Sequence, residues 1–485
     1  MREVTPVDGR LHRFRVAGVP FVLDVTTGTI ALLDEVSWDV LPHVVAGTAI
    51  PEPVLQRHGA AESLAAAGEF ERLEKEGHFL QADPMDDAMN RAAAGAVPAA
   101  LPVKGMCLLV AEACNMSCAY CFASGNSMAG GGDEARTACG TGRRMLMPTE
   151  VAERAIEFLV EHSGNRRRLD VDFFGGEPML NFDVVSSTSA YAVQRARLAG
   201  KTVGLTLTTN GSLLDQDACR FLNDSGVNMV ISLDGRASVH DRVRRFASGR
   251  PSYEECLRGA RLLTESRRSW RTSPASPYTY VRGTYTHYNL DFAEDVLHLV
   301  DEGFDYISME PVVCESGHPL AITESDLPRL FDEYERLARE YVRRAREGRP
   351  FRFFHFELDL DGGPCIPRRM SGCGAGRDYI AVTPDGSIYP CHQFVGREGF
   401  VMGNVWDGIT NNALQEVFAN ANVATRQRCR ECWARYMCGG GCHANAHMEN
   451  GVIDEPYSLG CELQRKRFEC AIYAKAMLLN RDRRL

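Results

Sequence analysis

The sequence has no long hydrophobic run and no excess of positive charge. It contains no stretch of about 18 or more uncharged apolar residues, and its first residues, MREVTPVDGRLHRFRV, lack the apolar core and cleavage site of a signal peptide. We therefore expect no membrane span and a cytoplasmic location. Asp and Glu number 64 and Lys and Arg 54, which gives a formal net charge of −10. An acidic chain lacks the basic surface that sequence-independent nucleic-acid binding requires, so we expect no nucleic-acid partner.

What the chain has in quantity is length and cysteine. Its 485 residues predict roughly three domains, and its 45% apolar and 24% charged residues are typical of a globular protein. Seventeen cysteines are many for a chain of cytoplasmic character, where clustered cysteines are more often metal ligands or catalytic groups than disulfides. Most lie in two clusters, one at 114–121 and one at 365–461.

The chain divides by pattern into four segments. Residues 1–85 predict three short strands of alternating apolar residues, followed by helices around 37–45 and 61–76. Residues 86–104 predict a linker, because they are rich in Ala, Gly and Pro. Residues 105–350 alternate strands with helices, and residues 351–485 form a Cys- and Gly-rich domain that ends in a helix at 461–479.

The alternating segment indicates an α/β fold with a parallel barrel or open sheet. A Gly-rich insert at 124–143 interrupts its first unit and predicts a mobile loop. We expect strands at 106–111, 169–174, 203–208, 227–233, 278–286 and 304–311, and helices at 148–162, 184–198, 215–223, 253–265, 290–300 and 325–347.

Three cysteines follow the first of these strands in the motif CNMSCAYC: Cys114, Cys118 and Cys121. A structural zinc site needs four ligands, whereas three thiolates on a [4Fe–4S] cluster leave one iron open to another ligand. The triplet therefore suggests a cluster that binds something at its free iron. The alternative is a zinc or disulfide motif with a distant fourth cysteine.

Polar and glycine residues also mark the ends of the other expected strands. Because active sites of barrels lie at the carboxyl ends of the strands, these residues predict the lining of one cavity. They are Gly175, Gly176, Glu177, Thr209, Asn210, Ser232, Asp234, Arg282 and Glu310.

On these motifs the sequence resembles the radical S-adenosylmethionine (SAM) enzymes. CNMSCAYC is similar to their C-x3-C-x-aromatic-C motif, and GGEP to the motif that meets the SAM amino group. The resemblance implies a partial (β/α)6 barrel in which SAM chelates the open iron. Reductive cleavage of SAM then yields methionine and a 5′-deoxyadenosyl radical, which abstracts a substrate hydrogen.

The same resemblance implies the residues that contact SAM. Gly175, Gly176 and Glu177 are expected to meet its amino group, Ser232 its ribose and Arg282 its carboxylate. Further expected contacts are Tyr120, Phe122, Thr209, Asn210, Asp234 and Glu310.

The second cysteine region contains Cys-x2-Cys spacing, which from the residues alone also fits a zinc ribbon. Its pattern resembles the SPASM extension of radical SAM enzymes and implies two auxiliary [4Fe–4S] clusters, three clusters in all. Cys365 either closes the first auxiliary cluster or leaves an iron free for a substrate thiolate. The resemblance assigns Cys373, Cys391 and Cys442 to the first cluster and Cys429, Cys432, Cys438 and Cys461 to the second.

The N-terminal unit resembles a winged-helix peptide-recognition domain, in which a leader peptide adds as a strand to the sheet edge; a structural cap is the alternative. The whole chain resembles the thioether-forming maturases of six-cysteines-in-forty-five-residues peptides. That resemblance implies a Cys-rich precursor peptide with a leader, a crosslink from Cys sulfur to carbon, and a low-potential electron donor of the flavodoxin or ferredoxin type. Alternatives are sulfatase-type Ser/Cys oxidation, carbon–carbon crosslinking, or a zinc-stapled binding protein without catalysis.

Several other residues are expected to be structural. The Arg-rich stretch at 242–245 predicts a solvated face. His392 and His443 follow expected ligand cysteines and are expected to support them rather than bind metal. Small core side chains are expected at Cys107, Cys219, Cys256 and Cys470.

Overall fold

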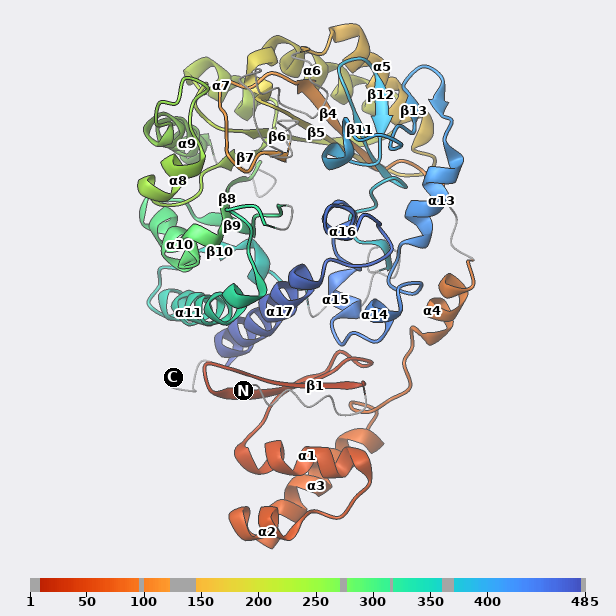
Figure 1. The fold of residues 1–485 in the computed structure, drawn as a ribbon, viewed down its shortest axis with the longest axis vertical. Helices are drawn as coiled ribbons and strands as arrows, with labels where there is room; N and C mark the ends of the chain where they lie inside the picture. The colour runs from red at the N-terminus through yellow and green to blue at the C-terminus, as the bar shows by residue number, and fades with distance from the viewer. Residues whose placement is uncertain are drawn as a thin grey trace.

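A computed structural model describes residues 9–95, 100–122, 145–270, 277–314, 317–359 and 370–480. The N-terminal unit lies at one end of the molecule, and the C-terminal segment packs beside the ring of strands and helices (Figure 1). The insert at 124–143 and Cys365 lie outside the described residues. Within those described ranges, no helix has both the length and the apolar character needed to cross a bilayer.

The N-terminal unit is a three-stranded antiparallel sheet followed by helices. Its strands β1 (Leu11–Val16), β2 (Val19–Asp24) and β3 (Ile30–Leu32) lie in that order. The helices are α1 (Glu35–Ala46), α2 (Glu52–His58) and α3 (Ala60–Lys75). The sequence predicted the strands and the helices α1 and α3. It did not predict α2, which buries no side chain and therefore has no apolar stripe.

Part of the expected linker at 86–104 forms helix α4 (Asp86–Ala93). Met89 and Ala92 are buried against Met370 and Val423 of the C-terminal segment. Helix α4 is therefore packed against the C-terminal segment.

Six parallel strands follow in the order β4 to β9, each next to its neighbour in sequence. The predicted α/β fold with a partial (β/α)6 barrel is confirmed, and every strand begins and ends within two residues of its predicted limits. The strands are β4 (Gly105–Ala111), β5 (Arg168–Gly175), β6 (Thr202–Thr209), β7 (Asn228–Ser232), β8 (Thr279–Tyr285) and β9 (Tyr306–Pro311). The helices are α5 (Thr149–His162), α6 (Phe182–Leu198), α7 (Gln216–Asp224), α8 (Ala237–Val243), α9 (Tyr253–Trp270), α10 (Phe292–Asp301) and α11 (Leu327–Arg346).

The C-terminal segment extends the same sheet. A hairpin forms from β11 (Tyr379–Val382) and β12 (Ser387–Tyr389), and β11 pairs in parallel with β4. Its last helix, α17 (Ser458–Leu479), packs on α11 and on β1. The remaining elements are β10 (Arg352–Phe353), β13 (Gly403–Asn404), β14 (Gly408–Ile409), α13 (Asn412–Asn420), α14 (Gln427–Arg430), α15 (Arg435–Cys438) and α16 (His443–Asn450), and short 3-10 turns at η2 (Pro178–Asn181), η3 (His287–Asn289), η4 (Glu324–Asp326), η5 (Phe354–Phe356) and η6 (His392–Phe394).

A buried ionic network joins the N-terminal sheet to α17 and α11. His12 Nε2 lies 3.1 Å from Glu469 Oε1, and Lys466 Nζ lies 3.1 Å from Glu469 Oε2 and 2.5 Å from Glu335 Oε1. Burial alone raises the pKa of Glu469, but the hydrogen bond with His12 and the charge of Lys466 hold that pKa below its ordinary value. The network therefore needs Glu469 to be ionised.

Glu469→Gln is expected to lower the free energy of unfolding at neutral pH by about 2 kcal/mol, the size of hydrogen bonds to a charged group. Because the folded pKa of Glu469 is lowered, its contribution is present above the unfolded pKa of about 4.3. It is lost as the pH falls through the folded value, so the variant loses less stability on acidification. Denaturant unfolding at a series of pH values measures this. Exposed Glu416→Gln is the control, and a wild-type pH slope in the Glu469 variant contradicts the assignment.

Candidate functional site

The loop after β4 carries Cys114, Cys118 and Cys121 at the carboxyl end of the sheet. The chain between α8 and α9 holds this loop through its backbone. The amide of Ser117 donates to the carbonyl of Arg245 at 2.8 Å, and that of Ala119 to the carbonyl of Val243 at 2.7 Å. This loop is called the three-cysteine loop below.

The three thiols of this loop converge. Burial raises the pKa of Cys114 above its ordinary value, and the neighbouring Glu177 carboxylate and the other two thiols raise it further. Burial likewise raises the pKa of Cys118 to about 12. Each thiol lies within electrostatic reach of the others, as ligands of one centre must.

Glu177 joins the ends of β5 and β6. Its carboxylate is fully buried and accepts hydrogen bonds from Met179 N at 3.0 Å, Thr209 Oγ1 at 2.7 Å and Asn210 N at 2.8 Å. Asn210 Nδ2 in turn donates to Asn115 Oδ1 at 2.8 Å. The network thus ties both strand ends to the three-cysteine loop.

Glycine is required where β5 meets this loop. Gly175 has φ +135°, and a Cβ there would lie 2.1 Å from the carbonyl oxygen of Ala111. The amide of Gly176 donates to that same carbonyl at 2.7 Å. The backbone of β5 can therefore approach the loop closely only without a side chain.

Arg244 is a site residue that sequence reasoning missed. It was expected on a solvated face, but only 8% of its surface is exposed, so that expectation was wrong for this residue. Its Nη1 donates to Tyr120 Oη at 2.9 Å, and Tyr120 Oη donates to Asp234 Oδ2 at 2.7 Å. No local pattern separates Arg244 from exposed Arg242 and Arg245, because its burial follows from the packing of α8 onto the three-cysteine loop.

Ser232 and Arg282 stand side by side on the inner face of the sheet. They are paired in the register of β7 and β8. Val281 and Gly283 are buried on the helix side, whereas Arg282 is exposed on the opposite side. Since successive strand residues alternate, Arg282 points into the interior of the barrel.

Glu310, near the end of β9, lies in the same interior, where the basic side chains of His355 and Arg467 contact its carboxylate. Its carboxylate lies 3.1 Å from His355 Nε2 and 3.3 Å from Arg467 Nη2. Burial alone raises the pKa of Glu310, but His355, Arg467 and Arg282 together hold that pKa well below its ordinary value. The carboxylate is therefore ionised.

Phe122 lies apart from these polar groups, in an aromatic cluster. Its ring stacks on Phe174 at 6.3 Å between centroids, and Phe174 contacts His392 at 4.6 Å. Burial and the charge of Arg282 lower the pKa of His392 to about 4. His392 is thus a neutral ring facing the interior of the barrel.

Four of the C-terminal cysteines line a single pocket. Cys429, Cys432, Cys438 and Cys461 surround it together with the basic residues Arg428, Arg435 and Arg465. We call it the four-cysteine pocket.

The other three, Cys373, Cys391 and Cys442, form a separate group. Burial raises the pKa of Cys391, and the nearby thiols of Cys442 and Cys373 raise it further. Between Cys438 and Cys442 the chain turns through glycines 439–441, whose φ angles are 71°, 93° and 76°. Other residues rarely adopt such angles, and the turn directs the two cysteines to different groups. Glu310 lies within electrostatic reach of Cys442, so this group faces the barrel interior.

These cysteine sets suit clusters better than single ions. Among the described residues, no three His, Cys, Asp or Glu side chains are close enough to hold one metal ion. In a cluster each thiolate binds a different iron, so the sulfurs stand further apart. All-thiolate donor sets are the ligands of iron–sulfur clusters, so the residues present fit that group.

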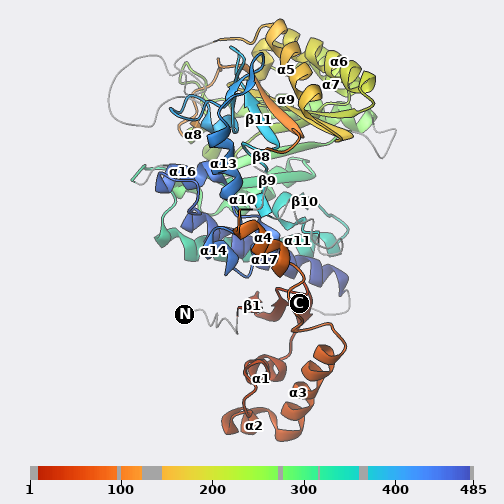
Figure 2. The same cartoon turned by 90° about the vertical axis from the view of Figure 1, so that its right-hand side faces the viewer.

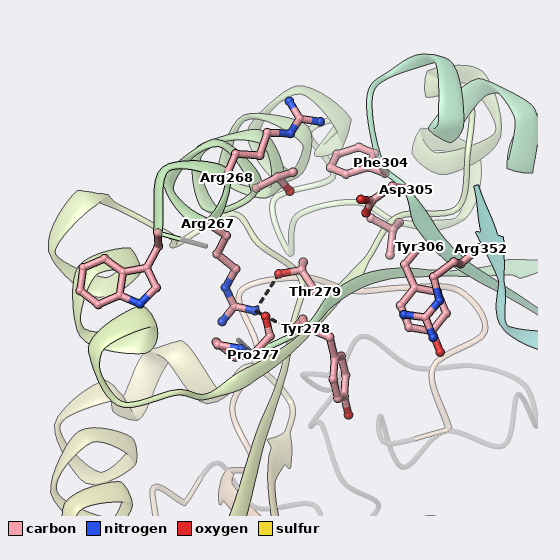
Figure 3. A pocket seen from close by; sticks show the side chains of 12 residues that line it. Arg267, Arg268, Pro277, Tyr278, Thr279, Phe304, Asp305, Tyr306 and Arg352 are labelled. Atoms are coloured by element: carbon pink, nitrogen blue, oxygen red, sulfur yellow. Dashed lines mark hydrogen bonds between the residues drawn. The ribbon is translucent and has the colours of Figure 1, made fainter. Parts of the chain in front are cut away.

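Another pocket lies at the opposite end of the strands. Its wall includes Thr279, Tyr306 and Arg352, which stand at or near the starts of β8, β9 and β10. Arg267 fills part of it and donates to Thr279 Oγ1 at 2.7 Å (Figure 3). None of the predicted site residues lines this pocket, so it is separate from the site.

Family comparisons agree with this geometry. Residues 108–274 match the radical SAM superfamily, and residues 373–433 match the SPASM iron–sulfur cluster-binding domain. The chain has a radical SAM domain followed by a SPASM domain. These two matches support S-adenosylmethionine and iron–sulfur clusters as the cofactors of these domains.

Individual proteins are similar over much of the chain. The serine-type anaerobic sulfatase-maturating enzyme of Klebsiella aerogenes is 24% identical over 365 residues, 72% of this chain and 82% of that protein. The cysteine-type enzyme of Clostridium novyi (strain NT) is 21% identical over 395 residues, 76% of this chain and 95% of that protein.

Two solved structures share the fold. anSMEcpe with bound AdoMet gives a TM-score of 0.61 at 18% identity and covers 78% of this chain and 99% of its own. Streptococcus suis SuiB bound to S-adenosylmethionine gives 0.50 at 18% identity and covers 95% of this chain and 100% of its own.

Proposed function

We propose that this enzyme is a peptide maturase that installs thioether crosslinks, from Cys sulfur to carbon, in a ribosomally made Cys-rich precursor peptide. The observation that carries the proposal is that the three-cysteine loop and the group of Cys373, Cys391 and Cys442 face one barrel interior. Phe122, which directly follows Cys121, contacts His392 at 5.4 Å between ring centroids. The charge of Arg282 acts on His392 and on Glu310, which in turn lies within electrostatic reach of Cys442. A substrate held there meets both groups.

Cys114, Cys118 and Cys121 are proposed to hold the [4Fe–4S] cluster that binds SAM. When bound, cluster and SAM together supply a 5′-deoxyadenosyl radical for hydrogen abstraction. Arg282 and Ser232, on the inner face, are placed to bind the carboxylate and ribose of SAM, and the Gly175–Gly176 backbone permits close approach. The fully buried Glu177 carboxylate accepts three hydrogen bonds within the protein, so the backbone of Gly175, Gly176 and Glu177 would meet the amino group of SAM.

The remaining predicted contacts are proposed to support the site. Thr209 and Asn210 donate hydrogen bonds to the Glu177 carboxylate. Tyr120, on the three-cysteine loop, donates a hydrogen bond to Asp234 and so fixes the position of the loop. Phe122 shields the loop with Phe174. Glu310 keeps a negative charge near Cys442.

Two auxiliary [4Fe–4S] clusters complete the proposal. The four-cysteine pocket would hold one. Cys373, Cys391 and Cys442 would hold the other, with Cys365 as its fourth ligand or with one iron left free for a substrate thiolate. Coordination deprotonates a thiol and would activate it for attack. A low-potential donor of the flavodoxin or ferredoxin type would supply electrons.

The second candidate is sulfatase-type oxidation of Ser or Cys. The similarity to the Klebsiella and Clostridium sulfatase-maturating enzymes favours it.

The N-terminal unit, in contrast, favours the first candidate, a maturase whose substrate is a peptide with a leader. SuiB covers 95% of this chain and anSMEcpe 78%, and a three-stranded sheet with an edge strand, β3, suits pairing with an extended peptide.

Incubation of the anaerobically purified enzyme with SAM, reductant and a Cys-rich precursor peptide tests the choice. Thioether formation removes two hydrogens per crosslink, and each crosslink consumes one thiol that iodoacetamide can alkylate. Serine oxidation also removes two hydrogens, but it consumes no thiol and leaves an aldehyde that reacts with a hydrazide. Mass spectrometry after both labels is expected to show lost thiols and no hydrazide adduct; the reverse pattern contradicts thioether formation.

A further inference from the structure

We propose that residues 83–93 pack behind the wall of the four-cysteine pocket and stabilise it, so that the N-terminal part of the chain helps to retain the metal of this pocket in addition to any peptide recognition. The inference rests on the proposed function in one respect, namely that this pocket holds a cluster. It concerns a segment whose composition indicated only a linker.

The first contact is apolar. Met85 and Met89 of this segment are 3% and 2% exposed and lie in one cluster with Val423 and Cys429. Val423 and Cys429 themselves line the four-cysteine pocket. Figures 1 and 2 both show α4 beside α14, the helix that carries Cys429. The methionines thus pack behind Val423 and Cys429, on the side of these residues that faces away from the pocket. Exclusion of solvent is one of the features that set the reduction potential of an iron–sulfur cluster.

The second contact is ionic. Asp83 Oδ2 accepts from Arg435 Nη2 at 3.1 Å and from Tyr436 Oη at 2.5 Å. The Asp83 and Arg435 side chains are 8% and 10% exposed, so this is a buried pair. Arg435 lines the pocket and stands between Cys432 and Cys438 in the chain. Loss of one partner from a buried pair is costly, because it leaves the other charge unpaired.

A third contact comes from the N-terminal sheet. The ring of His12, on β1, stacks on Trp433 with 3.8 Å between centroids and 7° between planes. Trp433 directly follows Cys432. The N-terminal part therefore contacts the chain between Cys429 and Cys438 both through residues 83–93 and through β1.

These contacts couple the segment and the metal in both directions. If residues 83–93 stabilise the metal-bound pocket, the bound metal must stabilise the packing of residues 83–93 by the same free energy. The iron content of variants measures the first effect, and hydrogen exchange of residues 85–93 measures the second.

The first test uses Asp83→Asn and Met89→Asn, with exposed Asp87→Asn and Arg91→Asn on the same helix as matched controls. After anaerobic reconstitution, Asp83→Asn and Met89→Asn are each expected to carry about four fewer irons per chain than the wild type, which corresponds to one cluster. The electron paramagnetic resonance signal that responds to added SAM is expected to remain, which shows that the variant is folded. Full iron content with unchanged signals in both pocket variants overturns the inference.

The second test needs no variant. Hydrogen exchange of the amides of residues 85–93 is compared in the cluster-loaded enzyme and after removal of iron with a chelator. Exchange is expected to quicken at least about tenfold, a loss of about 1.4 kcal/mol of protection. Equal rates overturn the inference. Wild-type enzyme with no metal in this pocket overturns both this inference and the proposed auxiliary cluster, whereas a loaded wild type with unaffected variants overturns only the inference.

Discussion

Cys114→Ala is expected to reduce the formation of 5′-deoxyadenosine from SAM to the background of the protein-free reaction. Cys114 is one of three thiols that converge after β4, and it lies within electrostatic reach of Glu177 and of the other two thiols. A cluster with two of its three protein ligands is not held, so the iron content is expected to fall by about four per chain. Chromatography of the nucleoside product and iron analysis measure the two effects.

Cys219→Ala is the matched control. Cys219 is 1% exposed in α7, far along the chain from the three-cysteine loop, and behaves as a core side chain. The control is expected to keep full iron and full 5′-deoxyadenosine formation. Persistent product in the Cys114 variant contradicts the assignment of this loop, and equal losses in both variants indicate damage to folding instead.

Arg244→Met is expected to lower the free energy of unfolding by about 3–5 kcal/mol, the cost of removing one member of a buried charged group. Its guanidinium donates to Tyr120 Oη, which donates to the buried Asp234 carboxylate. Burial raises the pKa of Asp234, and Arg244 opposes that shift. Without Arg244, the carboxylate loses a cation that opposes the rise in its pKa.

Three variants separate charge from geometry at this position. Arg244→Lys keeps the charge but not the planar fork of donors, so an intermediate loss is expected. Arg245→Met removes an exposed neighbour and is expected to cost less than about 0.5 kcal/mol. Denaturant unfolding under anaerobic conditions measures all three, and an Arg244→Met value equal to that of Arg245→Met contradicts a structural charge.

Elements whose apolar residues are neighbours in the sequence were predicted, and elements that depend on distant contacts or bury no side chain were not. The strands β4 to β9 were predicted because apolar residues run continuously through β4 and recur at alternate positions in strands such as β5 and β6, between turn residues. Helix α2 was missed because it buries nothing. Helix α4 was missed because its apolar residues Met89 and Ala92 lie in a segment whose Ala and Gly content is typical of a linker. Their partners Met370 and Val423 lie roughly 280 residues or more further along the chain.

The site shows the same division. Cys114, Cys118 and Cys121 lie within eight residues, so their spacing alone indicates a common centre. Arg244 carries no such signal, since its neighbours Arg242 and Arg245 have the same charge and only packing selects the one that is buried.

By itself the sequence determined the chemistry of the ligands and the order of the strands, because thiol spacing and apolar periodicity are properties of neighbouring residues. The tertiary structure decided three further features: the pairing of β11 with β4, the burial of Arg244 beneath the three-cysteine loop, and the packing of residues 83–93 on the four-cysteine pocket. Each depends on contacts between distant segments, whose free energy comes from burial and pairing that no local pattern records.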